Sequence, residues 1–148
     1  MKILHVNAGL EQGGGLSHIV NLLTEAKKEE KDFELLTLEE GPVAKAARAA
    51  NIATHVLGAK GRYDLSSLKR LTAFINDGHY DIVHTHGARA NLFLSLIRRK
   101  ITATWCITVH SDPYLDFADR GFLGKVFTKL NLHALRNANC VFVVTKRF

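Results

Sequence analysis

Three histidines occur at positions where side chains of their type could bind a metal ion or a phosphorylated substrate. His84 and His86 lie two residues apart in the apolar run at 80–87, so both side chains point to the same face of a strand. His110 closes a later apolar run, and Asp112 follows it as a further ligand or a base. Three imidazoles that meet at one edge of a sheet are typical of zinc sites. One interpretation is therefore a metal-dependent hydrolase that uses these histidines, although His84 alone also fits a core histidine bonded to backbone.

The residues after His110 decide between catalytic classes. Ser111 follows His110 directly, but neighbours at a strand end point apart, and the G-x-S-x-G elbow of serine hydrolases is absent. Asp112, Asp116 and Asp119 are spread along a loop that fits either solvated acids or a lid over an acceptor. For His110 itself we favour contact with a phosphate or a sugar.

A second chemical signal is the glycine run Gly13, Gly14 and Gly15, which follows an apolar run and precedes a helical pattern. We expect a loop here, because glycines let the chain turn sharply and bring backbone N–H groups close to an anion. The N-terminus of the next helix adds roughly half a positive charge. The run therefore predicts a diphosphate site, unless the glycines serve only close packing of strand and helix.

The glycine run matches no standard nucleotide motif in full. After Gly13 and Gly15, His18 stands where the dinucleotide motif requires a third glycine, although Glu39 is suitably placed to bind a ribose. The Gly-Lys-Ser/Thr of a P-loop is missing as well. A nicotinamide cofactor therefore remains only an alternative.

Alternating apolar patterns indicate the elements that must position these residues. Apolar runs predict six strands, and periodic patterns between them predict helices. The predicted strands cover Ile3–Val6, Phe33–Leu38, Thr54–Leu57, Tyr80–Gly87, Thr104–Val109 and Cys140–Thr145, and the helices include Leu16–Leu23, Val43–Ala50, a segment capped by Asp64, Ala88–Arg99 and a segment from Leu123 to Ala134. This order predicts an α/β fold, a Rossmann-like, doubly wound parallel sheet of about six strands with helices on both faces.

Ligands of such sheets bind beyond the carboxyl ends of the strands, at the switch point beside the first strand. Four of the predicted strands place polar or glycine residues there, which makes this edge the expected site. The candidates are Gly13, Gly14 and Gly15 for a diphosphate and His86, Gly87, Arg89, Ser111 and Lys146 for the rest of the cleft.

Composition limits the class of protein. The 148 residues are 47% hydrophobic, which suits one domain with a filled core. No apolar run approaches the roughly 20 residues that span a bilayer, and no signal peptide is evident, so we expect a cytoplasmic protein. The net charge of +6 discriminates poorly among anionic ligands, acidic membranes and nucleic acid. Arg98, Arg99 and Lys100 suit a helix end or a membrane-facing patch, and Cys106 and Cys140 resemble small core residues.

The order of these motifs resembles the N-terminal domain of retaining glycosyltransferases of the GT-B fold, family 4. The resemblance rests on KILHVNAGLEQGGGLSHIVNLL, YDIVHTHG, TVHS and NANCVFVVTKRF, and it covers nearly the whole chain. It implies that the glycine segment approaches the diphosphate of a nucleotide-sugar donor and that His110 is catalytic. It also implies that this chain, residues 1–148, is the acceptor-side domain, and that the donor-binding C-terminal domain with its Glu-x7-Glu pair is absent, because no Glu follows Glu40.

Three functions from different classes remain at this point. The first is sugar transfer with retention from a nucleotide-sugar donor to a sugar, lipid or small-molecule acceptor, without a metal or other cofactor. In that case we expect this domain alone to be inactive and to need the C-terminal domain of the same protein. We expect it to bind no nucleic acid, and peripheral contact with the inner membrane face is a further option. The second is metal-dependent hydrolysis through His84, His86 and His110, and the third is a self-contained nucleotide-binding module.

Overall fold

The computed structural model describes residues 1–61, 64–109, 129, 132–133 and 136–143. Strands and helices alternate along most of this part of the chain, as the sequence predicts. The elements are β1 (Ile3–Asn7), α1 (Gly13–Lys28), β2 (Phe33–Thr37), α2 (Pro42–Ala49), β3 (Thr54–Val56), α3 (Ser67–Asp77), β4 (Ile82–His86), α4 (Ala88–Ile97), a 3-10 turn (Arg98–Lys100), β5 (Thr104–Val109) and β6 (Cys140–Val143).

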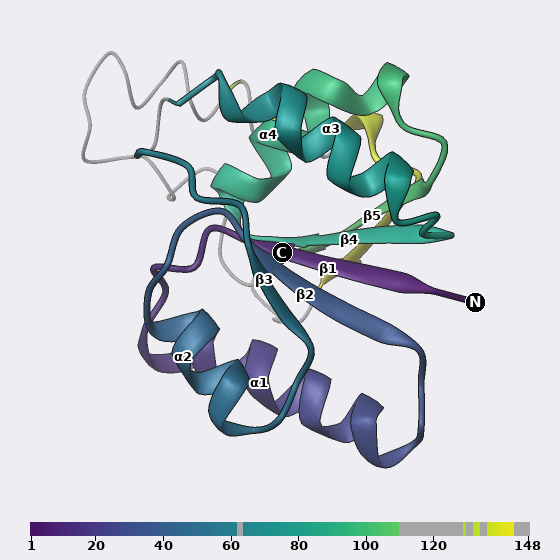
Figure 1. The fold of residues 1–148 in the computed structure, drawn as a ribbon. Helices are drawn as coiled ribbons and strands as arrows, with labels where there is room; N and C mark the ends of the chain where they lie inside the picture. The colour runs from purple at the N-terminus through teal and green to yellow at the C-terminus, as the bar shows by residue number, and fades with distance from the viewer. Residues whose placement is uncertain (62–63, 110–128, 130–131, 134–135, 144–148) are drawn as a thin grey trace.

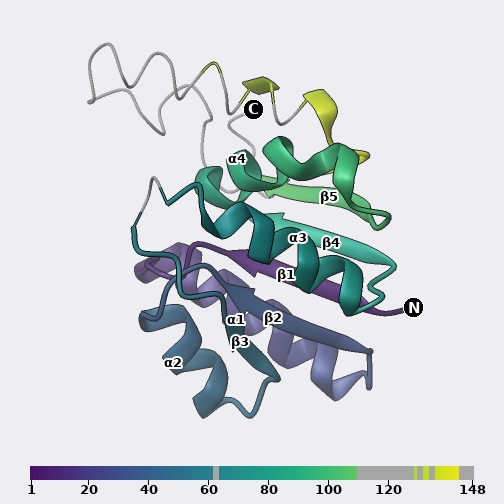
Figure 2. The ribbon, with the colours of Figure 1, turned by 45° about the horizontal axis from the view of Figure 1, so that its top comes forward.

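All six strands form one parallel sheet in the order β3-β2-β1-β4-β5-β6. Helices α1 and α2 cover one face, and α3 and α4 cover the other (Figure 1; Figure 2). This is the doubly wound, Rossmann-like arrangement with its switch point between β1 and β4. The predicted fold class is therefore confirmed.

Alternation along the strands builds a core on each face of the sheet. Leu4 and Val6 of β1 pack with Phe93 and Leu94 of α4 on one face. The opposite face carries a smaller core in which Leu35 packs with residues of α1 and α2, namely Ile19, Leu23, Val43, Ala47 and Ile52. Polar side chains interrupt this pattern on the two central strands, where His5 and Asn7 of β1 and His84 and His86 of β4 lie on the face that α1 and α2 cover.

Two helices begin at residues other than the predicted ones. Gly13, Gly14 and Gly15 form the first turn of α1, so the prediction of a glycine loop before the helix is wrong. Helix α3 begins at Ser67 and not directly after Asp64. The Asp64 carboxylate instead accepts hydrogen bonds from the backbone N–H of Lys60 and the hydroxyl of Ser66, so it closes the preceding turn.

Candidate functional site

The glycine turn of α1 lies directly after the carboxyl end of β1, beside the switch point. Gln12 precedes it without making a side-chain capping bond, and the first turn holds no acidic residue. The first N–H groups of a helix have no acceptor within the helix. Gly13 and Gly14 are exposed, and a Cβ added at either would meet no atom of the described chain within 4 Å. The positive end of the helix dipole therefore lies at an exposed part of the chain, at Gly13 and Gly14.

Asn7, the last residue of β1, connects this segment to the neighbouring strand. Its side chain is fully buried; Nδ2 donates to the backbone oxygen of His86 at 2.8 Å, and Oδ1 accepts from the N–H of Gly9 at 2.8 Å. Gly9 has φ +98°, a conformation that favours glycine, and a Cβ there would lie 2.4 Å from the backbone oxygen of Glu39. Asn7 therefore holds the start of the loop that leads to the glycine turn.

The carboxylate of Glu11 lies between the N-terminal ends of α1 and α4. A Cβ added at Gly15 would lie 3.0 Å from its Oε2, and one at Gly87, the residue before α4, would lie 2.7 Å from its Oε1. Negative charge is favourable at helix N-termini. An acidic side chain thus already occupies a position that suits an anion, between the two helix ends at the switch point.

Arg89 is engaged in an ion pair. Its Nη1 donates to the carboxylate of Glu39 after β2, and its Nη2 donates to the backbone oxygen of Gly61 at 2.6 Å. The guanidinium also lies over the ring of Phe93, 5.6 Å from its centroid. Glu39, the alternative ribose ligand of a dinucleotide, is therefore paired with the cation that was expected in the cleft.

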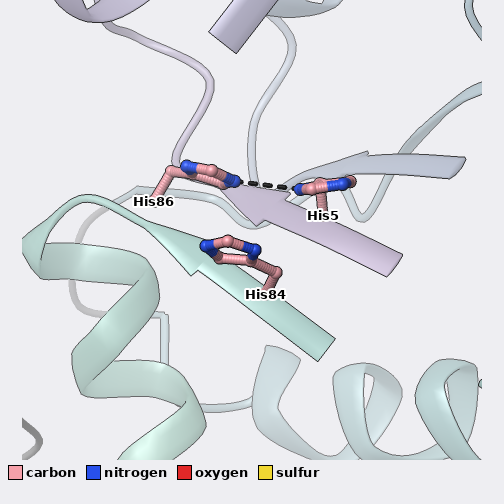
Figure 3. A group of neighbouring side chains, drawn as sticks. All are labelled: His5, His84 and His86. Atoms are coloured by element: carbon pink, nitrogen blue, oxygen red, sulfur yellow. Dashed lines mark hydrogen bonds between the residues drawn. The ribbon is translucent and has the colours of Figure 1, made fainter. Parts of the chain in front are cut away.

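Three imidazoles converge on the sheet face that α1 and α2 cover, as Figure 3 shows. The rings of His84 and His86 stack with centroids 4.5 Å apart, which confirms that they share a face. The third ring belongs to His5 of β1, which is paired with His84 across the sheet and whose Nδ1 lies 3.0 Å from Nε2 of His86. The ring of His18 in α1 lies 6.4 Å from that of His86.

The three histidines of this cluster differ in how deeply they are buried. His86 is fully buried and His5 is 7% exposed, whereas His84 is half-buried and its Nε2 bonds to Thr108 Oγ1. Burial, with a smaller contribution from the charge of His84, lowers the pKa of His5 from 6.5 to about 3. His5 is therefore neutral at physiological pH. A hydrolytic metal needs an open coordination position that a substrate can reach, so this buried trio does not favour the hydrolase interpretation.

Several predicted site residues lie outside the described residues. They are His110, Ser111 and Lys146, together with the loop acids Asp112, Asp116 and Asp119. The structure does place the strand before His110: β5 ends at Val109 and pairs with β4, one strand from the switch point. Of the remaining candidates, it brings His86 and Gly87 together with the C-terminal end of β1.

Sequence reasoning missed His5, Asn7 and Glu11. Two of them were detectable. His5 alternates with Leu4 and Val6, so it faces away from them, and Asn7 is a polar residue at the end of the first strand. The position of Glu11 between two helix N-termini depends on the path of the loop and had no sequence signal.

A family model described as Glycosyltransferase Family 4 matches residues 12–148. A search of curated proteins gives no match. Among the described residues, no helix is both long and apolar enough to cross a lipid bilayer.

Solved glycosyltransferase structures share the fold. A crystal structure of Anabaena Alr3699/HepE in complex with UDP is similar with a TM-score of 0.70 at 11% identity, covering 100% of this chain and 44% of that one. A complex of HepE with UDP-glucose gives a TM-score of 0.65 at 13% identity with the same coverage. The apo form of the lipopolysaccharide outer core galactosyltransferase WaaB gives 0.56 at 16%, covering 73% of this chain and 32% of that one. At such identities the likeness shows the fold, and this chain spans less than half the length of these proteins.

Proposed function

This chain belongs to glycosyltransferase family 4 and has the Rossmann-like fold of GT-B glycosyltransferases, and we propose that it forms the acceptor-side domain of an enzyme that transfers a sugar from a nucleotide-sugar donor. In the reaction, the bond between the anomeric carbon and the diphosphate oxygen breaks, and a bond to an acceptor oxygen forms with retention of configuration. The nucleoside diphosphate leaves, and its phosphate oxygen takes the proton that the acceptor hydroxyl loses.

The observation that carries this proposal is the exposed glycine turn of α1. Its first backbone N–H groups lie beyond β1, where doubly wound folds bind their ligands, and Gly13 and Gly14 are exposed, with no described atom within 4 Å of an added Cβ. Charge that develops on the departing diphosphate would be stabilised by these donors and by the helix dipole. We propose that transfer needs no metal ion, since the donor phosphates are neutralised by backbone groups and basic side chains.

The roles of the other residues follow from their places around this turn. We propose His110 as the catalytic residue, since it follows a strand that pairs beside the switch-point strand β4. Gly87 lies at the cleft after the end of β4, with Ser111 and Lys146 as further acceptor or cleft residues, whereas fully buried His86 lies beneath it. Arg89 is assigned a positioning role, because its ion pair with Glu39 joins the start of α4 to the end of β2.

A second domain completes the proposed site. HepE, of which this chain covers 44%, has been crystallised with UDP and with UDP-glucose, which supports a nucleotide-sugar donor here. We propose that the donor binds between this domain and a second α/β domain of the same protein, and that this domain alone is inactive. We also propose a cytoplasmic enzyme with peripheral membrane contact, acting on a sugar, lipid or small-molecule acceptor.

Sugar transfer by the full-length protein, assayed with a panel of nucleotide sugars, tests the proposal. His110→Ala should lower turnover by roughly 100-fold, as loss of one preorganised contact to a transition state often does. His133→Ala, at an exposed histidine, is the matched control and should leave turnover unchanged. Near-normal turnover of a folded His110→Ala protein would overturn the assignment of this strand end to the active site.

A further inference from the structure

The ring nitrogens of His5, His84 and His86 form a compact group of potential metal ligands. Each ring contributes one nitrogen to a group in which all three atoms lie within 4.8 Å of one another. The ligands come from two strands, with His5 on β1 paired to His84 on β4, and His86 two residues further along β4 (Figure 3). The backbone of a paired sheet therefore holds the three side chains in place.

The spacing of these atoms is close to that of a tetrahedral metal site. Zinc–nitrogen bonds of about 2.0–2.1 Å place neighbouring ligand nitrogens about 3.3 Å apart. His5 Nδ1 and His86 Nε2 are 3.0 Å apart, so this pair already has nearly the required separation. The ring nitrogen of His84 lies within 4.8 Å of the other two nitrogens, so it would move closer to them to bind the same ion. The hydrogen bond between His5 and His86 would give way to two bonds to the ion, with the shared proton carried on the other nitrogen of the donor ring.

We propose that His5, His84 and His86 bind a divalent transition metal ion of the zinc class, which ties β1 to β4 beneath the switch point. Imidazole suits zinc, cobalt, nickel and copper and does not suit magnesium. The site is distinct from the proposed donor site, which consists of backbone groups at the start of α1.

The surroundings supply what a metal site requires beyond its ligands. Metal-binding histidines generally donate their second ring nitrogen to an oxygen, which fixes the tautomer. Thr108 Oγ1, hydrogen-bonded to His84 Nε2, supplies such an oxygen partner for His84. The ring of half-exposed Phe142 lies 5.6 Å from that of His84, and His18 approaches His86 from α1. With three protein ligands, a water molecule would be the fourth ligand, on the side of half-buried His84.

Cobalt titration of the full-length protein, after removal of metal by a chelator, tests this inference through the visible absorption of four-coordinate Co²⁺. Zinc competition and metal analysis then give affinity and stoichiometry. We expect one ion per chain, displaced by Zn²⁺ and not by Mg²⁺. His86→Gln should weaken Zn²⁺ binding by at least about 100-fold, since even a change in an outer residue costs 10–100-fold. His79→Asn is the control: His79 is exposed and has φ 53°, a conformation that asparagine tolerates, so this variant should bind Zn²⁺ as the parent does.

A second variant covers the case in which His86→Gln does not fold. Thr108→Val removes the hydroxyl that orients His84 while keeping a β-branched side chain in β5, and we expect about 10–100-fold weaker binding. The inference is overturned if the parent protein binds no Co²⁺ in four-coordinate form. It is equally overturned if folded Thr108→Val and folded His86→Gln keep the affinity of the parent. Neither result depends on sugar transfer, so failure here leaves the proposed function untouched.

Discussion

Replacement of Asn7 by alanine tests how the end of β1 is held at the switch point. The fully buried amide makes two hydrogen bonds of 2.8 Å, one to the backbone oxygen of His86 and one from the N–H of Gly9. Asn7→Ala removes both and leaves a buried carbonyl and a buried N–H without these partners. Each such loss costs about 1–3 kcal/mol. Some relaxation is expected, so we predict a fall of about 2–4 kcal/mol in the free energy of unfolding.

Equilibrium unfolding in urea, followed by circular dichroism, measures this change. Asn21→Ala is the matched control, because Asn21 is exposed on α1 and its loss should change stability by no more than about 0.5 kcal/mol. Because Gly9 leads toward the glycine turn, we also expect weaker binding of a nucleoside diphosphate to the folded Asn7→Ala protein. An unfolding free energy equal to that of the control would refute the view that this amide anchors the loop.

Two further predictions concern charge and reactivity. Glu11→Gln removes a negative charge from between two helix N-termini. UDP should therefore bind the full-length variant about fivefold more tightly, a gain of about 1 kcal/mol that calorimetry measures. Weaker binding would contradict this prediction and make the carboxylate a contact for UDP. Burial, with the neighbouring Cys140, raises the pKa of the Cys106 thiol from 9.0 to about 11, so alkylation near neutral pH should be about 100-fold slower than in the unfolded chain. Mass spectrometry of the alkylated peptides checks this, and equal rates would contradict the burial of Cys106.

Much of the fold could be predicted because short apolar runs alternate with helical patterns along the chain. Runs such as Thr104–Val109 are too short and too rich in β-branched and aromatic residues for buried helices, and the helical patterns between them require parallel crossovers. The glycine run predicts a loop because glycine lets the chain turn sharply. Although glycine is a poor helix former, it costs little in the first turn of a helix, where a Cβ at Gly14 would meet no described atom within 4 Å.

The site was harder to predict because its contacts join distant parts of the chain. His5 and His84 meet only through the register of β1 against β4, which is a tertiary property. The ion pair of Arg89 with Glu39 likewise links two strand ends whose side-chain directions the sequence does not reveal. The strand-end rule assigns the proposed site to the carboxyl edge of the sheet, and the strand order of a doubly wound sheet, applied to His5, would have found the third imidazole.

Binding of UDP to the full-length Gly14→Val protein tests the central claim most directly. A Cβ at Gly14 meets no described atom of the chain within 4 Å, so the fold should tolerate the change, and an unfolding curve confirms this. If the glycine turn holds the donor diphosphate, the added side chain obstructs its approach, and calorimetry should show UDP affinity reduced by at least about tenfold, or about 1.4 kcal/mol. Unchanged affinity in a folded Gly14→Val protein would contradict the assignment of the donor diphosphate to this turn.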